Sequence, residues 1–261
     1  ATGVLPVFVG AATKACDLLP DTGKTYIAGL RLGVTTDTQD IWGRVITQKE
    51  CNDHPVTAEQ FAQIAGRFLG DIMQMPPMYS AVKIGGKRLY EFARRGVEIE
   101  RPERPVTIHE LCVQKANEQA GEYTIEVSCS KGTYIRTLCA DIGDSLGCGA
   151  VMTSLVRTRA SGFLLEDCMT LDEIERRARE DGAQGMLIPV ERAFMRLPEL
   201  RLNEEQTMWF LNGAKFPMQA PLDHDLRVYA HEGTFLGLGY IERQTARLRV
   251  RRFMGGQTLR G

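Results

Sequence analysis

The sequence predicts an α+β protein with a mixed, largely antiparallel sheet flanked by helices, followed by a small β-rich domain. Residues 25–32 alternate apolar side chains with smaller or polar ones, which is typical of a strand with two different faces. The runs 106–115 and 122–130 flank a polar turn and predict a β-hairpin. Short strands return at 226–254, after a change of composition near Leu197.

Two helices carry clear start signals. Residues 56–70 begin with Thr57 as N-cap and Gln60 as its capping-box partner. The same box recurs at Thr170 and Glu173. The buried stripe expected for the first helix consists of Phe61, Ile64 and Phe68.

The length of 261 residues allows one large domain or two unequal ones. We expect a larger domain over 1–196 and a smaller one over 197–261, which starts with a helix at 203–213. The longest apolar stretch, residues 4–12, is interrupted by proline and glycine and is shorter than the ~20 residues of a membrane span. We therefore expect a soluble protein without a membrane partner.

The seven cysteines are scattered, without a CxxC pair, and the four histidines show no ligand spacing. This pattern predicts no disulfide framework and no metal site, and it fits a reducing cytoplasm. Gly85-Gly86-Lys87 lacks the spacing of a phosphate-binding P-loop. The net charge of −1 does not indicate a nucleic-acid binder, so local clusters must carry any such interpretation.

The stretch 128–137 carries the most chemical information. A strand turns through Gly132 into a helix expected at 133–146, which leaves backbone N–H groups open beside Lys131 and Arg136. Such a corner attracts a phosphate or a carboxylate, and Tyr134 offers a flat face for a base. The alternative is that Arg136 forms a structural ion pair and Tyr134 packs in the core.

Two basic segments are candidates for RNA contact. Residues 76–105 have a net charge of +3 with interleaved aromatic rings, which fits either a solvated surface or an RNA-gripping one. Alternating arginines near the C-terminus line one strand face and, without acidic partners, require an anion. The candidate RNA-binding residues are Lys83, Lys87, Arg88, Arg94, Arg95, Lys131, Arg247, Arg249 and Arg251.

Asp37 and Asp40 suggest a pair of catalytic carboxylates. Their Thr-rich loop favours ordinary turn chemistry instead, because Asp side chains commonly accept hydrogen bonds from nearby backbone N–H groups.

Several blocks in order make the chain similar to the bacterial TruB-type tRNA pseudouridine synthases. They lie at residues 1–6, 24–26, 76–83, 86–90, 131–137, 146–150 and 155–158. The resemblance implies the pseudouridine synthase fold and isomerisation of uridine 55, which is flipped out of the tRNA T loop. It also implies that covalent attack, base rotation and reattachment through C5 proceed without cofactor or metal.

The same resemblance implies roles for individual residues. Tyr26 would stack on the target base and is a candidate general base, while Arg136 would orient a nucleophilic aspartate. Tyr134 and Leu155 would line the uracil pocket. The family motif Gly-x-Leu-Asp-Pro-x-Ala-x-Gly aligns so that its aspartate falls three positions before Ala1. We therefore expect the nucleophile on preceding polypeptide, and an Arg136 without a partner in the present sequence.

The resemblance further implies that residues 76–105 are an RNA-gripping insertion and that 197–261 form a PUA-like RNA-binding domain. The expected partner is the T arm of tRNA, without any required protein partner, in the cytoplasm. One alternative is a non-catalytic tRNA-binding or tRNA-folding protein. Another is a structural domain without an RNA partner.

Overall fold

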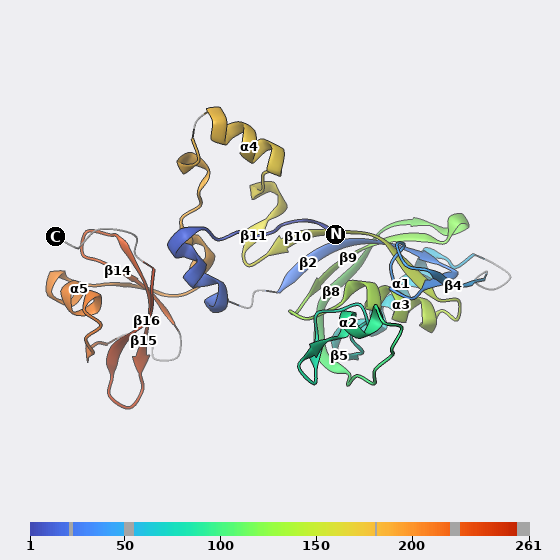
Figure 1. Cartoon of the computed structure of the whole chain (residues 1–261), viewed down its shortest axis with the longest axis horizontal. Coiled ribbons are helices and arrows are strands. Elements are labelled where there is room, and N and C mark those ends of the chain that lie inside the picture. Colours follow the sequence, from blue (N-terminus) through green and yellow to red (C-terminus); the bar gives the residue numbers. More distant parts are fainter. Residues whose placement is uncertain (21–22, 50–54, 181, 220–224, 255–261) are drawn as a thin grey trace. The chain divides into compact units, whose positions relative to one another are not determined.

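The structure, a computed structural model, describes residues 1–20, 23–49, 55–180, 182–219 and 225–254. The chain divides into two compact units, drawn in Figure 1. One unit comprises Ala1–Leu5 with Asp21–Cys168, and the other comprises Pro6–Pro20 with Met169–Gly261. The division between Cys168 and Met169 lies before the domain boundary expected near Leu197. The expected domains 1–196 and 197–261 remain a prediction.

The first unit is built on a seven-stranded sheet with the path β1-β10-β2-β9-β8-β5. Only β1 pairs in parallel, with β10; the other pairs between described strands of this sheet are antiparallel. The predicted mixed, largely antiparallel sheet is confirmed. The strands are β1 (Thr2–Gly3), β2 (Lys24–Leu32), β5 (Gly70–Gln74), β8 (Arg104–Asn117), β9 (Glu122–Cys129), β10 (Ala150–Ala160) and β11 (Phe163–Leu164).

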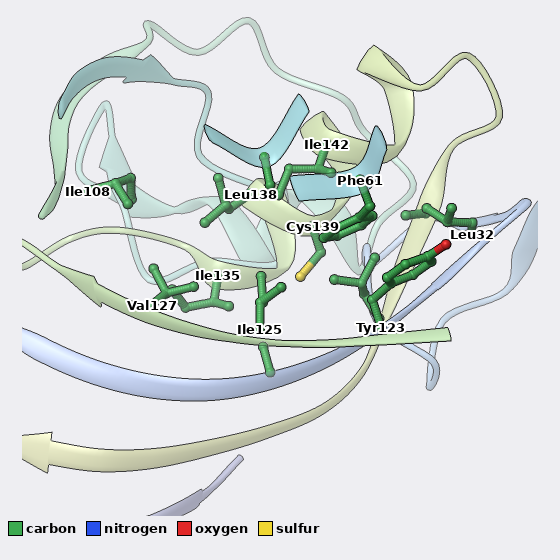
Figure 2. Close-up of a cluster of buried hydrophobic side chains, with 14 of the residues drawn as sticks. Leu32, Phe61, Ile108, Tyr123, Ile125, Val127, Ile135, Leu138, Cys139 and Ile142 are labelled. Atoms are coloured by element: carbon green, nitrogen blue, oxygen red, sulfur yellow. The ribbon is translucent and has the colours of Figure 1, made fainter. Parts of the chain in front are cut away.

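Helices α1 (Ala58–Ala65) and α3 (Ile135–Ser145) contribute to a single core on one face of this sheet. Figure 2 shows Leu138, Cys139 and Ile142 of α3 gathered with Phe61 of α1 over the side chains of β9. The rings of Phe61 and Tyr123 stack with centroids 4.1 Å apart. The alternation predicted for residues 25–32 is confirmed, because Ala28, Leu30 and Leu32 are buried in this core.

The capping box at the start of α1 is confirmed, since Gln60 N donates to Thr57 Oγ1 and Thr57 N donates to Gln60 Oε1. The helix is shorter than predicted. It tightens into a 3-10 turn after Ala65, and β5 begins at Gly70, whose φ of +88° suits glycine. The sequence pattern does not predict this strand, because residues 70–74 show no clear alternation of apolar and polar side chains.

Two small hairpins project from the main sheet. The first pairs β3 (Val34–Thr36) with β4 (Val45–Gln48). The second pairs β6 (Lys83–Ile84) with β7 (Lys87–Arg88) and leads into α2 (Leu89–Ala93). Leu89 is fully buried, and Arg101 Nε donates to the Pro76 carbonyl at 2.6 Å. The two ends of the basic insertion are therefore joined by a hydrogen bond, and its middle is held by a buried leucine.

The second unit contains a five-stranded sheet with its own core and the path β12-β14-β15-β16-β13. Its strands and helices are β12 (Glu199–Arg201), β13 (Phe216–Pro217), β14 (Leu226–Tyr229), β15 (Phe235–Glu242), β16 (Arg247–Phe253), α4 (Leu171–Glu180) and α5 (Glu204–Leu211). The expected strands after residue 226 and the short helix at 203–213 are confirmed. The 3-10 helices among the described residues lie at Gly10–Leu18, Gly66–Phe68, Glu118–Ala120, Leu165–Asp167, Gln184–Met186 and Val190–Phe194.

Among the described cysteines, Cys148 differs from expectation, because it is disulfide-bonded. Spacing along the chain cannot show which thiols meet in space, so the sequence did not reveal this bond. Within the described ranges, the free thiols are Cys16, Cys112, Cys129, Cys139 and Cys168. In the described part of the chain, no helix is long and apolar enough to cross a membrane.

Candidate active site

The corner between β9 and α3 is held by hydrogen bonds to its neighbours. Ser130 N donates to the Thr107 carbonyl, and Thr107 N donates to Ser130 Oγ, both at 2.9 Å. Thr133 Oγ1 donates to the Ser130 carbonyl at 3.0 Å. Gly132 has a φ of +85°, so this turn favours a residue without a Cβ. The corner presents the first turn of α3 in one orientation.

Gln74, at the end of β5, closes the backbone of this corner. Its Oε1 accepts from Tyr134 N at 2.8 Å, and its Nε2 donates to the Tyr134 carbonyl at 3.1 Å. The Gln74 side chain is only 2% exposed. The expectation of an open N–H group is therefore wrong at Tyr134, because a glutamine remote in sequence already satisfies it.

Arg136, on the first turn of α3, has two partners. Its Nη1 lies 3.3 Å from Asp40 Oδ2, and its Nη2 donates to the Tyr79 carbonyl. The side chains of Arg136 and Asp40 are 18% and 20% exposed, so the ion pair is mostly buried. The expectation of an Arg136 without a partner is wrong, because Asp40 supplies a carboxylate from within the chain.

The loop between β3 and β4 orients Asp40. Asp40 Oδ1 accepts from Thr38 Oγ1 at 2.9 Å and from Trp42 N at 3.1 Å, which leaves Oδ2 for Arg136. Asp37 Oδ1 accepts from Arg44 N of the same loop at 2.9 Å. Both aspartates perform the turn chemistry expected of them, but Asp40 also reaches the site.

Asp40 does not exhaust the donors of Arg136. A guanidinium carries five N–H groups in a planar fork, and the Asp40 and Tyr79 contacts engage one hydrogen on each terminal nitrogen. The remaining donors include Nε–H, so the group is able to bind a second carboxylate or a phosphate while it stays in place. The anion-binding interpretation of this corner is compatible with the observed ion pair.

Tyr26 and Leu155 lie on the face of the sheet that α3 covers. Both pack against the same core as α3, and Leu155 stands opposite Ala28 in the β2–β10 ladder. Burial raises the pKa of Tyr26, and a hydrogen bond from Arg157 opposes that rise. Tyr26 and the helix that carries Arg136 thus lie on the same side of the sheet. Among the described residues, no hydrogen bond connects the Tyr26 and Arg136 side chains.

The exposed cations Lys83, Lys87 and Arg88 form what we call the cationic hairpin. Lys83 stands directly opposite Arg88 across β6 and β7, an arrangement of like charges that an anion would relieve. The Arg88 and Arg94 guanidinium groups lie 5.8 Å and 5.1 Å from the centre of the Tyr90 ring. Arg95 and Lys131 are exposed as well.

The arginines of β16 differ from expectation. Arg249 pairs with Glu242 at 3.1 Å, and Arg251 lies 3.9 Å from Asp225, so this strand face is not uncompensated. Arg247 is exposed. The acidic partners come from the neighbouring strand β15 and from the residue before β14, so the sequence around the arginines does not show them.

Comparisons with known proteins agree along almost the whole chain. Residues 1–135 match the model for the TruB family pseudouridylate synthase N-terminal domain. Residues 136–195 match the tRNA pseudouridylate synthase B C-terminal domain, and 198–254 match the C-terminal model of pseudouridine synthase II TruB.

Two relatives share the name tRNA pseudouridine synthase B. The one from Geobacillus kaustophilus (strain HTA426) is 44% identical over 226 residues, which are 85% of this chain and 79% of that protein. The one from Clostridium tetani (strain Massachusetts / E88) is 41% identical over 244 residues, covering 92% and 81% of the two chains. A solved structure titled as a Cbf5-Nop10-Gar1 complex has the same fold, with a TM-score of 0.69, 23% identity and coverage of 97% of this chain and 72% of that one.

The fold and these matches define an RNA-modifying isomerase of the pseudouridine synthase class. The chain belongs to the TruB family of pseudouridylate synthases.

Proposed function

We propose that this protein isomerises uridine 55 in the T loop of tRNA to pseudouridine. The observation that carries the proposal is the Arg136 guanidinium, held by Asp40 and Tyr79 with donors to spare, on the side of the sheet that carries Tyr26 and Leu155. The relatives named tRNA pseudouridine synthase B support tRNA as the substrate.

In the proposed mechanism the target uridine leaves the base stack and enters a pocket lined by Tyr134 and Leu155. An aspartate, which the family motif places before Ala1, attacks the nucleotide and is oriented by Arg136. The bond from C1′ to N1 breaks, the uracil rotates, and C1′ bonds to C5 while the aspartate is released as the free carboxylate. Loss of the C5 proton, with Tyr26 as candidate base, and protonation of N1 complete an isomerisation in which atoms balance.

We also propose two RNA-binding regions. The insertion at 76–105 would grip the T stem through the cationic hairpin together with Arg94 and Arg95, with Lys131 beside the pocket. Residues 197–261 would act as a PUA-like domain in which Arg247, Arg249 and Arg251 face RNA. A cytoplasmic location without cofactor, metal or obligatory protein partner belongs to the same proposal.

The test uses the protein as translated from its gene and tRNA labelled with tritium at C5 of uridine. Tritium release measures turnover, and chemical mapping of pseudouridine locates the product. We expect release from position 55, and Arg136→Ala or Tyr26→Phe to nearly abolish it while tRNA binding stays largely intact. Binding without release would favour the alternative, a tRNA-binding or tRNA-folding protein. Equal loss of binding and turnover in these variants would contradict the roles assigned to the two residues.

A further inference from the structure

Arg157 on β10 stands directly opposite Tyr26 on β2, and a β-bulge follows it. The ladder pairs Arg157 with Tyr26 and then Arg159 with Thr25, which leaves one extra residue on β10. Because directly paired residues of neighbouring strands share a face of the sheet, the bulge separates the two arginines. Arg157 lies on the face of Tyr26, whereas Arg159 donates to Thr25 Oγ1 at 3.2 Å and Ser128 Oγ at 3.4 Å on the other.

Arg157 also holds the segment that follows the expected nucleophile. Its Nε donates to the Val4 carbonyl at 2.6 Å, and Val4 N donates back to the Arg157 carbonyl at 2.8 Å. Gly3 pairs with Arg157 so closely that an added Cβ would lie 2.2 Å from the Arg157 carbonyl oxygen. The first residues of the chain are thus fixed against the same arginine that faces Tyr26.

The Arg157 guanidinium acts on the acidity of the Tyr26 hydroxyl. Burial is the main effect and raises the pKa of Tyr26; the nearby Cys129 thiol raises it further, while the hydrogen bond and charge of Arg157 lower it. In the described part of the chain, no carboxylate lies within 4.0 Å of Arg157 to neutralise this charge. The arginine therefore has no ion-pair partner there that would account for its position.

We propose that Arg157 is a positioning residue of the isomerisation. It orients the Tyr26 hydroxyl, holds the strand that follows the nucleophile, and so sets the two reacting groups relative to each other. This inference rests on the proposed function and adds to it a residue that touches Tyr26 rather than the substrate. A purely structural clamp on Val4 would make the same backbone contact without influencing Tyr26.

The first test measures Tyr26 itself. In protein as translated from its gene and labelled with 3-fluorotyrosine, fluorine NMR follows the ionisation of each tyrosine, and Tyr26→Phe assigns the resonance. We expect Arg157→Met to move the Tyr26 titration to higher pH and Arg157→Lys to restore part of the shift. The matched control Arg159→Met, on the opposite face, should leave the titration unchanged.

The second test measures single-turnover isomerisation and tRNA affinity in the same variants. We expect Arg157→Met to slow the reaction roughly ten- to hundredfold at neutral pH, with affinity within about twofold of the parent. Arg157→Lys should recover part of the rate, and it keeps the test valid where the methionine variant fails to fold. If Arg157→Met left the Tyr26 titration unchanged, this inference would be overturned while the proposed function would stand. Absence of turnover in the parent protein would instead overturn the proposed function, and with it the positioning role of Arg157.

Discussion

At the scale of single residues, the site is organised by side chains that are remote in sequence from the motif they serve. Asp40 and Arg136 are separated by 96 positions, and Gln74 and Tyr134 by 60. Each contact is mostly buried, so each strongly constrains geometry, because a buried polar group that loses its partner is costly. The functional motif at 131–137 is thus positioned by residues that show no motif of their own.

Asp40→Asn tests the buried ion pair. The substitution keeps the size of the side chain but removes the charge that holds Arg136, so we expect the single-turnover rate constant to fall by roughly ten- to hundredfold with little change in tRNA affinity. The measurement is single-turnover kinetics with a parallel binding assay. Asp37→Asn is the matched control, since Asp37 lies in the same loop and its carboxylate accepts a hydrogen bond from Arg44 N. Equal effects of the two substitutions would show that the loop, rather than the ion pair, matters.

Gln74→Leu tests the closure of the corner. Removing the amide leaves the N–H and carbonyl of Tyr134 without their buried partner, which should lower the free energy of unfolding by about 1–3 kcal/mol. Urea unfolding measures the loss. The Gln74→Glu variant retains an acceptor for Tyr134 N, so it should recover part of the stability; a leucine variant as stable as the parent would contradict the role of this contact.

At the scale of elements, α3 combines a rigid apolar face with an acidic one. Its inward side chains belong to the main core, while Asp141 lies near Asp144 and Glu103. Burial first, and then these two carboxylates, raise the pKa of Asp141 from 3.8 to about 6. The helix that carries Arg136 therefore responds to pH in the mildly acidic range.

This shift predicts how stability depends on pH. Between pH 3.8 and about 6 the folded state binds a proton at Asp141 that the unfolded chain has released, so the free energy of unfolding falls as pH rises through this window. Asp141→Asn should remove this contribution. Urea unfolding at several pH values measures it, with the exposed Asp17→Asn as control. If the free energy of unfolding of Asp141→Asn depended on pH as that of the parent does, the pH dependence would come from another residue.

At the scale of the whole molecule, the net charge of −1 conceals an uneven distribution of cations. The arginines of α4 pair with glutamates one turn away, as Arg177 does with Glu173 at 2.7 Å. The cationic hairpin has no such ion pairs among the described residues. Whether nearby acidic side chains neutralise the cations, rather than the net charge of the protein, therefore decides which surface is suited to an RNA backbone.

Salt dependence tests this distinction. Replacing Lys83, Lys87 and Arg88 with alanine should weaken tRNA binding. It should also reduce the slope of log K against the logarithm of the salt concentration by about 0.7–0.9 for each phosphate that the variant no longer binds. The matched control replaces Arg176, Arg177 and Arg179 of α4, whose charges are paired within the helix. An equal decrease of the slope in the two triple variants would remove the hairpin from the proposed RNA surface.

The structural features that the sequence predicts correctly are those that depend on residues close together in the chain. The capping box of Thr57 and Gln60, the two-faced strand around Ala28 and the Gly132 corner each depend on residues a few positions apart, so spacing alone reveals them. The blocks shared with the TruB family likewise lie within continuous stretches, and they identified the family before any contact was known.

Tertiary structure alone decided which distant groups meet. No periodic pattern in the sequence connects Asp40 with Arg136. The composition of β10 likewise does not show the bulge that places Arg157 on the face of Tyr26 and Arg159 on the opposite face. The pairing of Arg249 with Glu242 was hidden in the same way. The physical reason is that hydrophobic pattern and capping act over one or two turns of chain, whereas ion pairs and ladder register depend on how separate strands and helices pack in space.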